Sequence, residues 1–261
     1  MRMPPLLRAS LEIWIVAVVF ATCTGCGETV KSVADKHRAA SQPKLDKLKV
    51  IAAAAQNQAP VTRDSFDLPP GVKLDFSQMV DRQHNALIAN LMYLANPCNA
   101  ESQAWTPDNL PPGPYNRFRA PLDQSDPLLR DPGCVLATGK GVHGEPAPSV
   151  LNDAFIRMER TLYVLVLRVR RAVRPQLSLA EIEARKVETF TAGEIEGDAL
   201  LYEVETGKYL GGIALNVRNK DKTTVRTKAI ADQLEAQLLQ AASDALYRKI
   251  IELNPGSQPP S

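Results

Sequence analysis

The sequence predicts an α+β fold in which a small antiparallel sheet packs against a long C-terminal helix. Two observations lead to this prediction. Residues 199–217 contain two apolar segments joined by a short turn, and residues 224–253 carry apolar side chains at helical spacing. A helix with one apolar side has to bury that side, and the apolar face of the hairpin is its nearest partner.

The clearest unit is a β-hairpin. Residues 199–204 and 209–217 are its two strands, and Gly207 between them supplies the positive φ that a tight turn needs. From Ile213 onward, apolar and more polar residues alternate, which gives the second strand one apolar and one wetter face. Gly211-Gly212 indicates a bulge in this strand.

A third strand and the last helix complete the predicted sheet layer. Residues 161–170 are apolar and rich in β-branched side chains, so we expect a central strand that is covered on at least part of both faces. Packing of the helix on the sheet is preferred, and self-association through a coiled coil remains an alternative. The apolar stripe of the helix consists of Ile230, Leu234, Leu238, Ala242, Leu246 and Ile250.

Helices are also predicted in the N-terminal half. Residues 26–43 are polar and are expected to form a flexible spacer, and the single domain is expected to cover residues 44–253. Its first helix spans residues 44–57, beyond Pro43, and could dock on the domain through its apolar side chains. A second helix is predicted from Ser77 to about Ala95.

His84 lies on the apolar side of this second predicted helix. It is interpreted as a hydrogen-bonded core residue, because a lone histidine on an apolar face is more often structural than catalytic. The sequence contains no serine or cysteine nucleophile motif. A phosphate-binding loop is not supported at Gly139-Lys140-Gly141, because no apolar strand precedes the glycines.

A long loop rich in proline and glycine is expected over residues 99–150. Its aromatic and arginine side chains are the candidate contact surface, because such side chains are suited to recognition. An alternative is that the aromatic residues only fix the loop to the domain. The candidate residues are Trp105, Tyr115, Arg117, Phe118 and Arg119. Residues 254–261 are expected to be a disordered tail.

The cysteines that follow Cys26 are expected to be paired. Cys98 and Cys134 form an even pair within the mature domain, and we expect a disulfide between them, with two free buried thiols as the alternative. His37, His84 and His143 are scattered, without partner cysteines or carboxylates at ligand spacing. No metal or other cofactor is therefore predicted.

The N-terminus has the order of a signal peptide. Arg2 and Arg8 precede an apolar run from Ile13 to Ala21, and small residues follow. This run is roughly half of the ~20 residues that a membrane-spanning helix needs. We therefore expect residues 1–25 to be removed and no permanent transmembrane anchor to remain.

The sequence Cys23-Thr24-Gly25-Cys26 follows this run and resembles the lipobox of bacterial lipoproteins. The resemblance covers about the first 26 residues, and Cys23 stands where an aliphatic residue is usual. It implies that Cys26 is acylated, for example with palmitate, and becomes the first mature residue. Acylation of Cys23 and an ordinary cleaved signal peptide are the alternatives. Gly27, in place of an aspartate, implies sorting to the outer membrane.

The formal net charge of +2 falls to +1 when Arg2, Arg8 and Glu12 are removed, which does not suggest binding to nucleic acid. The sequence thus predicts a lipoprotein of the cell envelope, facing the periplasm or exterior. We expect a non-enzymatic module that contacts a protein or cell-wall component. The alternative is an envelope hydrolase or transferase whose catalytic groups converge only in the fold.

Overall fold

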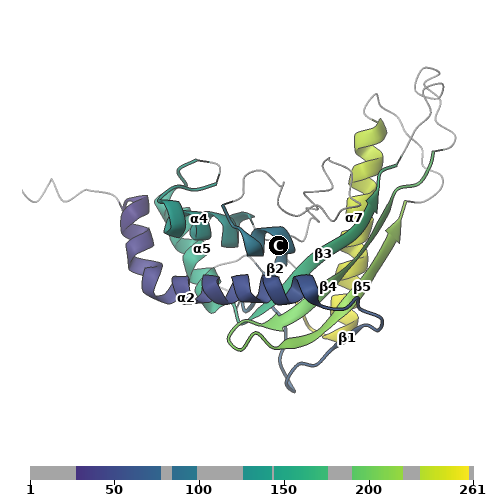
Figure 1. Cartoon of the computed structure of the whole chain (residues 1–261), viewed down its shortest axis with the longest axis horizontal. Coiled ribbons are helices and arrows are strands. Elements are labelled where there is room, and N and C mark those ends of the chain that lie inside the picture. The colour runs from purple at the N-terminus through teal and green to yellow at the C-terminus, as the bar shows by residue number, and fades with distance from the viewer. Residues whose placement is uncertain are drawn as a thin grey trace, which may run out of the picture.

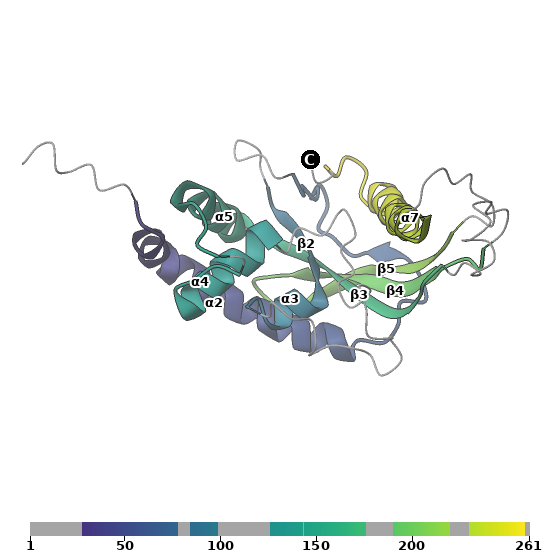
Figure 2. The ribbon, with the colours of Figure 1, turned by 90° about the horizontal axis from the view of Figure 1, so that it is seen from above.

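A sheet of five strands lies between a layer of helices and a single long helix in the computed structural model (Figure 1; Figure 2). The strand order is β1-β5-β4-β3-β2, and all neighbours are antiparallel except β2 and β3, which are parallel. The predicted α+β fold is therefore confirmed. The structure describes residues 28–77, 84–98, 126–142, 144–175, 190–219 and 230–258.

Strands and helices are interspersed along the chain. The strands are β1 (Ser65–Phe66), β2 (Ala86–Asn90), β3 (Tyr163–Val173), β4 (Glu194–Glu203) and β5 (Tyr209–Arg218). The helices are α2 (Val30–Asn57), α3 (Leu91–Ala95), the short π-helix η3 (Asp126–Arg130), α4 (Asp131–Thr138), α5 (Pro148–Arg160) and α7 (Ile230–Leu253).

The predicted hairpin is formed by β4 and β5. Gly207 in its turn has a φ of 70°. The pairing of the two strands shifts by one residue between Leu201, which faces Gly211, and Tyr202, which faces Tyr209, so the predicted bulge is present. Gly211 has a φ of 114°, and a Cβ there would collide with the backbone oxygen of Ser65. This glycine therefore lets β1 pair with β5.

One face of the sheet is covered by α7, as predicted. The stripe from Leu234 to Ile250 is buried, and from Leu238 onward it packs in one cluster with Leu165, Leu201 and Ile213 of the sheet. Neighbouring residues of β3 point to the opposite face, where Val164 joins a second apolar cluster. Burial on both faces confirms that β3 is an interior strand.

The opposite face is covered by α2, α3, α4 and α5. The predicted spacer over residues 26–43 is wrong in its described part, because α2 runs from Val30 to Asn57 with Pro43 inside it, as a helix that bends along its length (Figure 1). A capping box between Thr29 and Ser32 starts the helix. Val30 and other residues of its first turns are buried, and this packing offsets the cost of about 3 kcal/mol for an internal proline.

The helix predicted from Ser77 to Ala95 is also wrong. Among its described residues, 86–90 form the strand β2 and Leu91–Ala95 form the short helix α3. All five residues of β2 are buried because helices cover one face and the other belongs to the core under α7. An uninterrupted apolar run fits a strand buried on both faces as well as it fits a helical stripe. Asn90 then caps α3 through its side-chain oxygen.

Two segments are more ordered than the sequence suggested. Within the predicted loop over 99–150, residues 126–138 form η3 and α4, with Leu128, Leu129 and Val135 buried. In the predicted tail, the Asn254 side chain accepts from the Leu74 N–H at 2.9 Å and donates to the Val72 carbonyl at 2.8 Å. The described part of the tail, through residue 258, therefore lies against residues 72–76.

Candidate functional site

A groove lies between α2 and α4, beside the disulfide. Its volume is about 420 Å³. Apolar walls with a few polar groups are typical of ligand sites. The groove is lined by Gln42, Leu45 and Lys49 of α2, by Ala95, Asn96, Pro97 and Cys98 after α3, and by Gly133 and Ala137 of α4.

The disulfide holds one end of this groove. Cys98 is bonded to Cys134, as predicted, and the two residues are 36 positions apart in the sequence. Closing a loop of that length stabilises the fold by about 4 kcal/mol in the chain-entropy account. A Cβ at Gly133 would lie 2.8 Å from Cβ of Pro97. Glycine at this position therefore allows α4 to pack directly against the chain that follows α3.

Arg130 supports the groove from inside the protein. Its side chain is buried, with the guanidinium carbon 4.2 Å from the centre of the Tyr93 ring. Its Nε also donates to the carbonyl oxygen of Pro97 at 3.4 Å. These contacts fix the segment that lines the groove, because a guanidinium is attracted to an aromatic face and carries several donors in a fixed plane.

The predicted contact residues Trp105, Tyr115, Arg117, Phe118 and Arg119 all lie outside the described residues, and so does the predicted lipidation site at Cys26. The groove itself was missed by sequence reasoning. Only Cys98 and Cys134 gave a signal, because a disulfide joins two segments that must then lie side by side.

A polar cluster lies between α2 and α5. His37 Nδ1 is 2.8 Å from Glu159 Oε1, and its Nε2 is 3.0 Å from Asn152 Oδ1. The ring stacks on Phe155, with centroids 5.1 Å apart. The hydroxyl of Ser41 donates to Glu159 Oε1 at 2.9 Å. Because the hydroxyl contacts the carboxylate instead of the imidazole, the cluster lacks the nucleophile–base contact of a catalytic triad.

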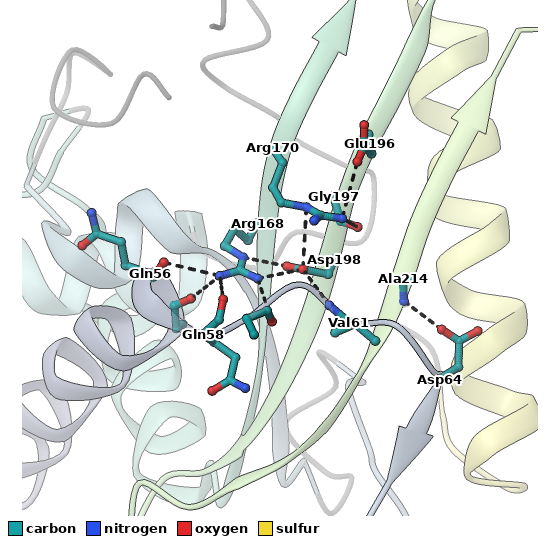
Figure 3. Close-up of polar contacts among 12 residues, drawn as sticks. Gln56, Gln58, Val61, Asp64, Arg168, Arg170, Glu196, Gly197, Asp198 and Ala214 are labelled. Carbon is teal, nitrogen blue, oxygen red and sulfur yellow. Dashed lines mark hydrogen bonds and ion pairs between the residues drawn. The ribbon is translucent and has the colours of Figure 1, made fainter. Parts of the chain in front are cut away.

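A buried ion pair joins the end of α2 to the sheet (Figure 3). Nε and Nη2 of Arg168 each donate to a different oxygen of Asp198, both at 2.7 Å. Nη1 of Arg168 donates to the carbonyls of Ala55 at 2.7 Å and Gln58 at 2.6 Å. The Val61 N–H reaches Asp198 at 3.4 Å. The arginine thus satisfies carbonyls that a helix C-terminus leaves without partners.

No known protein family, curated protein or solved structure matches this chain. Among the described residues, no three histidine, cysteine or acidic residues are grouped so that they could hold a metal ion. None of the described helices combines the length and the apolar character needed to cross a membrane.

Tyr202 and His84 are buried side chains with shifted pKa values. Burial, followed by the nearby Tyr209, raises the pKa of Tyr202 to about 12, and its hydroxyl has no hydrogen-bond partner among the described residues. Burial lowers the pKa of His84, whose Nδ1 lies 2.9 Å from the Ser77 carbonyl oxygen and whose Nε2 lies 3.2 Å from Thr161 Oγ1. His84 is thus a bonded core residue, as predicted.

The two polar clusters are closed inside the protein, whereas the groove is open to solvent. The side chains of His37, Glu159, Arg168 and Asp198 bind one another or the backbone inside the protein. Lys49 of the groove has half its side chain exposed. The groove, which is open to a ligand, is therefore the candidate functional site.

Proposed function

We propose that this protein is a lipoprotein of the bacterial envelope, anchored through Cys26, whose folded domain acts by binding and not by catalysis. The observation that carries the proposal is the order of the N-terminus, in which an apolar run from Ile13 to Ala21 precedes Cys23-Thr24-Gly25-Cys26. The Cys98–Cys134 disulfide supports it, because disulfides persist in oxidising compartments. Gly27 after the cysteine favours the outer membrane.

The start of the fold is compatible with cleavage at this site. Thr29, the N-cap of α2, lies three residues after Cys26. Cleavage before Cys26 therefore removes none of the described structure. Three extended residues span at most roughly 10 Å, so an anchor on Cys26 would hold the beginning of α2 close to the membrane surface.

The proposed binding role rests on the groove beside the disulfide. Leu45, Pro97 and Ala137 provide apolar surface, and Gln42 and Lys49 provide polar groups at its border. A protein or cell-wall component can be recognised by this combination, since apolar area supplies affinity and a few polar groups fix orientation. The disulfide and the buried Arg130 keep the walls in place before a partner binds.

Intact mass of the membrane-fraction protein, expressed in its host, tests the anchor. The expected species is the chain from Cys26 with a diacylglyceryl group or three acyl chains. Two or more chains are needed for firm attachment, because one chain gives only marginal binding. A soluble product without lipid would refute the anchor.

Two cysteine variants make this measurement specific. Cys26→Ala is expected to abolish the lipid mass and leave the precursor uncleaved at this position. Cys23→Ala is the matched control and is expected to leave the modification unchanged, because it removes the neighbouring thiol only. Loss of lipid in Cys23→Ala, with retention in Cys26→Ala, would show that Cys23 is the acceptor.

A photo-crosslinking amino acid at Gln42 tests the groove in intact cells. The expected result is a discrete adduct with one envelope protein or with cell-wall glycan. The matched control is the same amino acid at Val150, which is 56% exposed and outside the groove. Identical adducts from both positions, or none from Gln42, would contradict a binding role for the groove.

A further inference from the structure

The groove between α2 and α4 has an apolar floor and a polar rim. The two helices lie side by side in both views of the fold (Figure 1; Figure 2). Among the residues that line the groove, Leu45 and Pro97 are buried and form its floor. Gln42, Lys49 and Asn96 are more exposed, so their polar groups lie at the rim. A ligand in this groove therefore contacts apolar surface below it and polar groups along its sides.

Two carboxamide groups of the rim are able to bond to a ligand. Nε2 of Gln42 donates to Asp46 Oδ1 at 3.1 Å, which fixes the nitrogen and leaves the amide oxygen as an acceptor. The side chain of Asn96 has no hydrogen-bond partner among the described residues, so it offers both donors and an acceptor. A peptide backbone presents the matching groups, an N–H and a C=O in each residue. The rim is thus complementary to a peptide backbone.

Lys49 is the one charged side chain among the described residues that line the groove. Its Nζ is 3.4 Å from Asp46 Oδ1, and the two side chains are 51% and 58% exposed. A surface ion pair of this kind contributes little to stability, so the ammonium group keeps hydrogens for a ligand. Asp46 itself does not line the groove. The groove therefore carries a positive charge, which favours a ligand with a carboxylate.

The spacing of the polar groups fits a short peptide. Gln42 and Lys49 are about two turns apart on α2, which corresponds to roughly 10 Å along the helix. An extended peptide covers this distance with about three residues, because each residue adds about 3.3 Å. The groove volume of about 420 Å³ lies towards the small end of the range for ligand sites, ~300–1,000 Å³. The groove therefore suits the end of a chain better than a long segment.

We propose that the groove binds the C-terminus of another protein in extended form, with the α-carboxylate at Lys49 and the last peptide groups at Gln42 and Asn96. This proposal rests on the binding role proposed for the groove. Small apolar side chains of the ligand pack on Leu45 and Pro97. A protein C-terminus is favoured over cell-wall material, because the apolar floor would leave the hydroxyls and additional charges of the cell wall without partners. It is favoured over a fatty acid, because an acyl chain cannot bond to the carboxamides.

Two peptide pools test the role of the carboxylate. Both pools contain acetylated tripeptides of alanine, valine, leucine and proline, one with free C-terminal carboxylates and the other with C-terminal amides. Saturation-transfer NMR measures their binding to the full-length protein in detergent. The free-acid pool is expected to bind about tenfold more tightly than the amide pool, because an ammonium group forms stronger hydrogen bonds with a charged acceptor.

Variants at two lysines of α2 make this measurement specific. Lys49→Gln is expected to remove the preference for the free acid, and Lys49→Arg is expected to keep it, because arginine also carries a positive charge. The matched control is Lys47→Gln, which is expected to leave the preference unchanged, because Lys47 pairs with Glu205 and lies outside the groove. Asn96→Ala is expected to weaken both pools equally, because it removes a bond to the peptide backbone. Thermal unfolding, followed by circular dichroism, checks that each variant is folded.

Three results would overturn the proposal. One is equal binding of the two pools, and another is a preference for the free acid that persists in Lys49→Gln. The third is tighter binding of decanoate, or of a free-acid pool that ends in D-alanine, since these probes represent a fatty acid and a cell-wall peptide. A specific adduct from photo-crosslinking at Gln42, without binding of the free-acid pool, would refute the C-terminal ligand alone. Absence of that adduct would refute the binding role of the groove itself.

Discussion

The two faces of the sheet are covered in different ways. On one face a single helix, α7, packs through aliphatic side chains such as Leu238. On the other face α2, α3, α4 and α5 meet, held by a disulfide and by buried polar contacts such as Arg168–Asp198. The first face depends on apolar packing. The second depends also on directional contacts between segments far apart in the sequence.

This difference indicates where each face is vulnerable. Loss of a methyl group affects apolar packing gradually, whereas loss of one partner from a buried ion pair leaves a charge without compensation. The α2 face should therefore respond most strongly to single polar substitutions. The α7 face should respond in proportion to the apolar volume that is removed.

The largest effect is expected for Asp198→Ala. Arg168 would keep its charge in a buried site without a carboxylate, which costs about 3–5 kcal/mol in free energy of unfolding. Urea unfolding of the mature chain, followed by circular dichroism, measures this loss. Replacing both residues, as Arg168→Met with Asp198→Leu, is expected to recover part of it, because no charge is then buried. A double variant no more stable than Asp198→Ala would contradict this explanation.

Leu238→Ala tests the apolar face, with a smaller expected effect. Leu238 is fully buried between α7 and the sheet, so truncation should cost about 3 kcal/mol. The matched variant is Leu48→Ala, at an equally buried position on α2. Similar losses are expected for the two leucines, since both side chains are fully buried. A difference of more than about 2 kcal/mol would break this comparison.

The smallest effect is expected for Tyr202→Phe on the α2 face. The hydroxyl of Tyr202 is buried without a hydrogen-bond partner among the described residues, so its removal should leave stability unchanged or raise it by about 1 kcal/mol. Urea unfolding again provides the measurement. A loss of about 1 kcal/mol or more would show that a water or another group satisfies this hydroxyl.

The α7 face could be predicted from the sequence because its signals are local. The alternation around Ile213, Gly207 in the turn and the stripe through Leu238 each occur within one element. The α2 face could not be predicted in the same way. The run at residues 86–90 fits two structures until its neighbours are known, and Pro43 suggested a break that the packing of Val30 overrides.

The same reasoning applies to the candidate site. The Cys98–Cys134 pair was predictable because the N-terminus suggested export, and an even number of cysteines favours a disulfide in exported proteins. The groove beside it depends on how α2 meets α4, which no residue pattern specifies. Arg168 within an apolar strand did carry a signal, because a charge in such a run requires a buried partner. Its partner Asp198 lies thirty residues away, and sequence spacing did not identify it.

Hydrogen bonds at both ends of α2 limit how that helix can open. Its first turn is closed by the Thr29–Ser32 capping box, and its last carbonyls are held by Arg168. Between them, His37 ties the helix to α5. Fraying usually starts where terminal groups are free, and here some of the groups at each terminus have partners. Amide protons in the middle of α2 should therefore exchange mainly through cooperative opening of the helical layer.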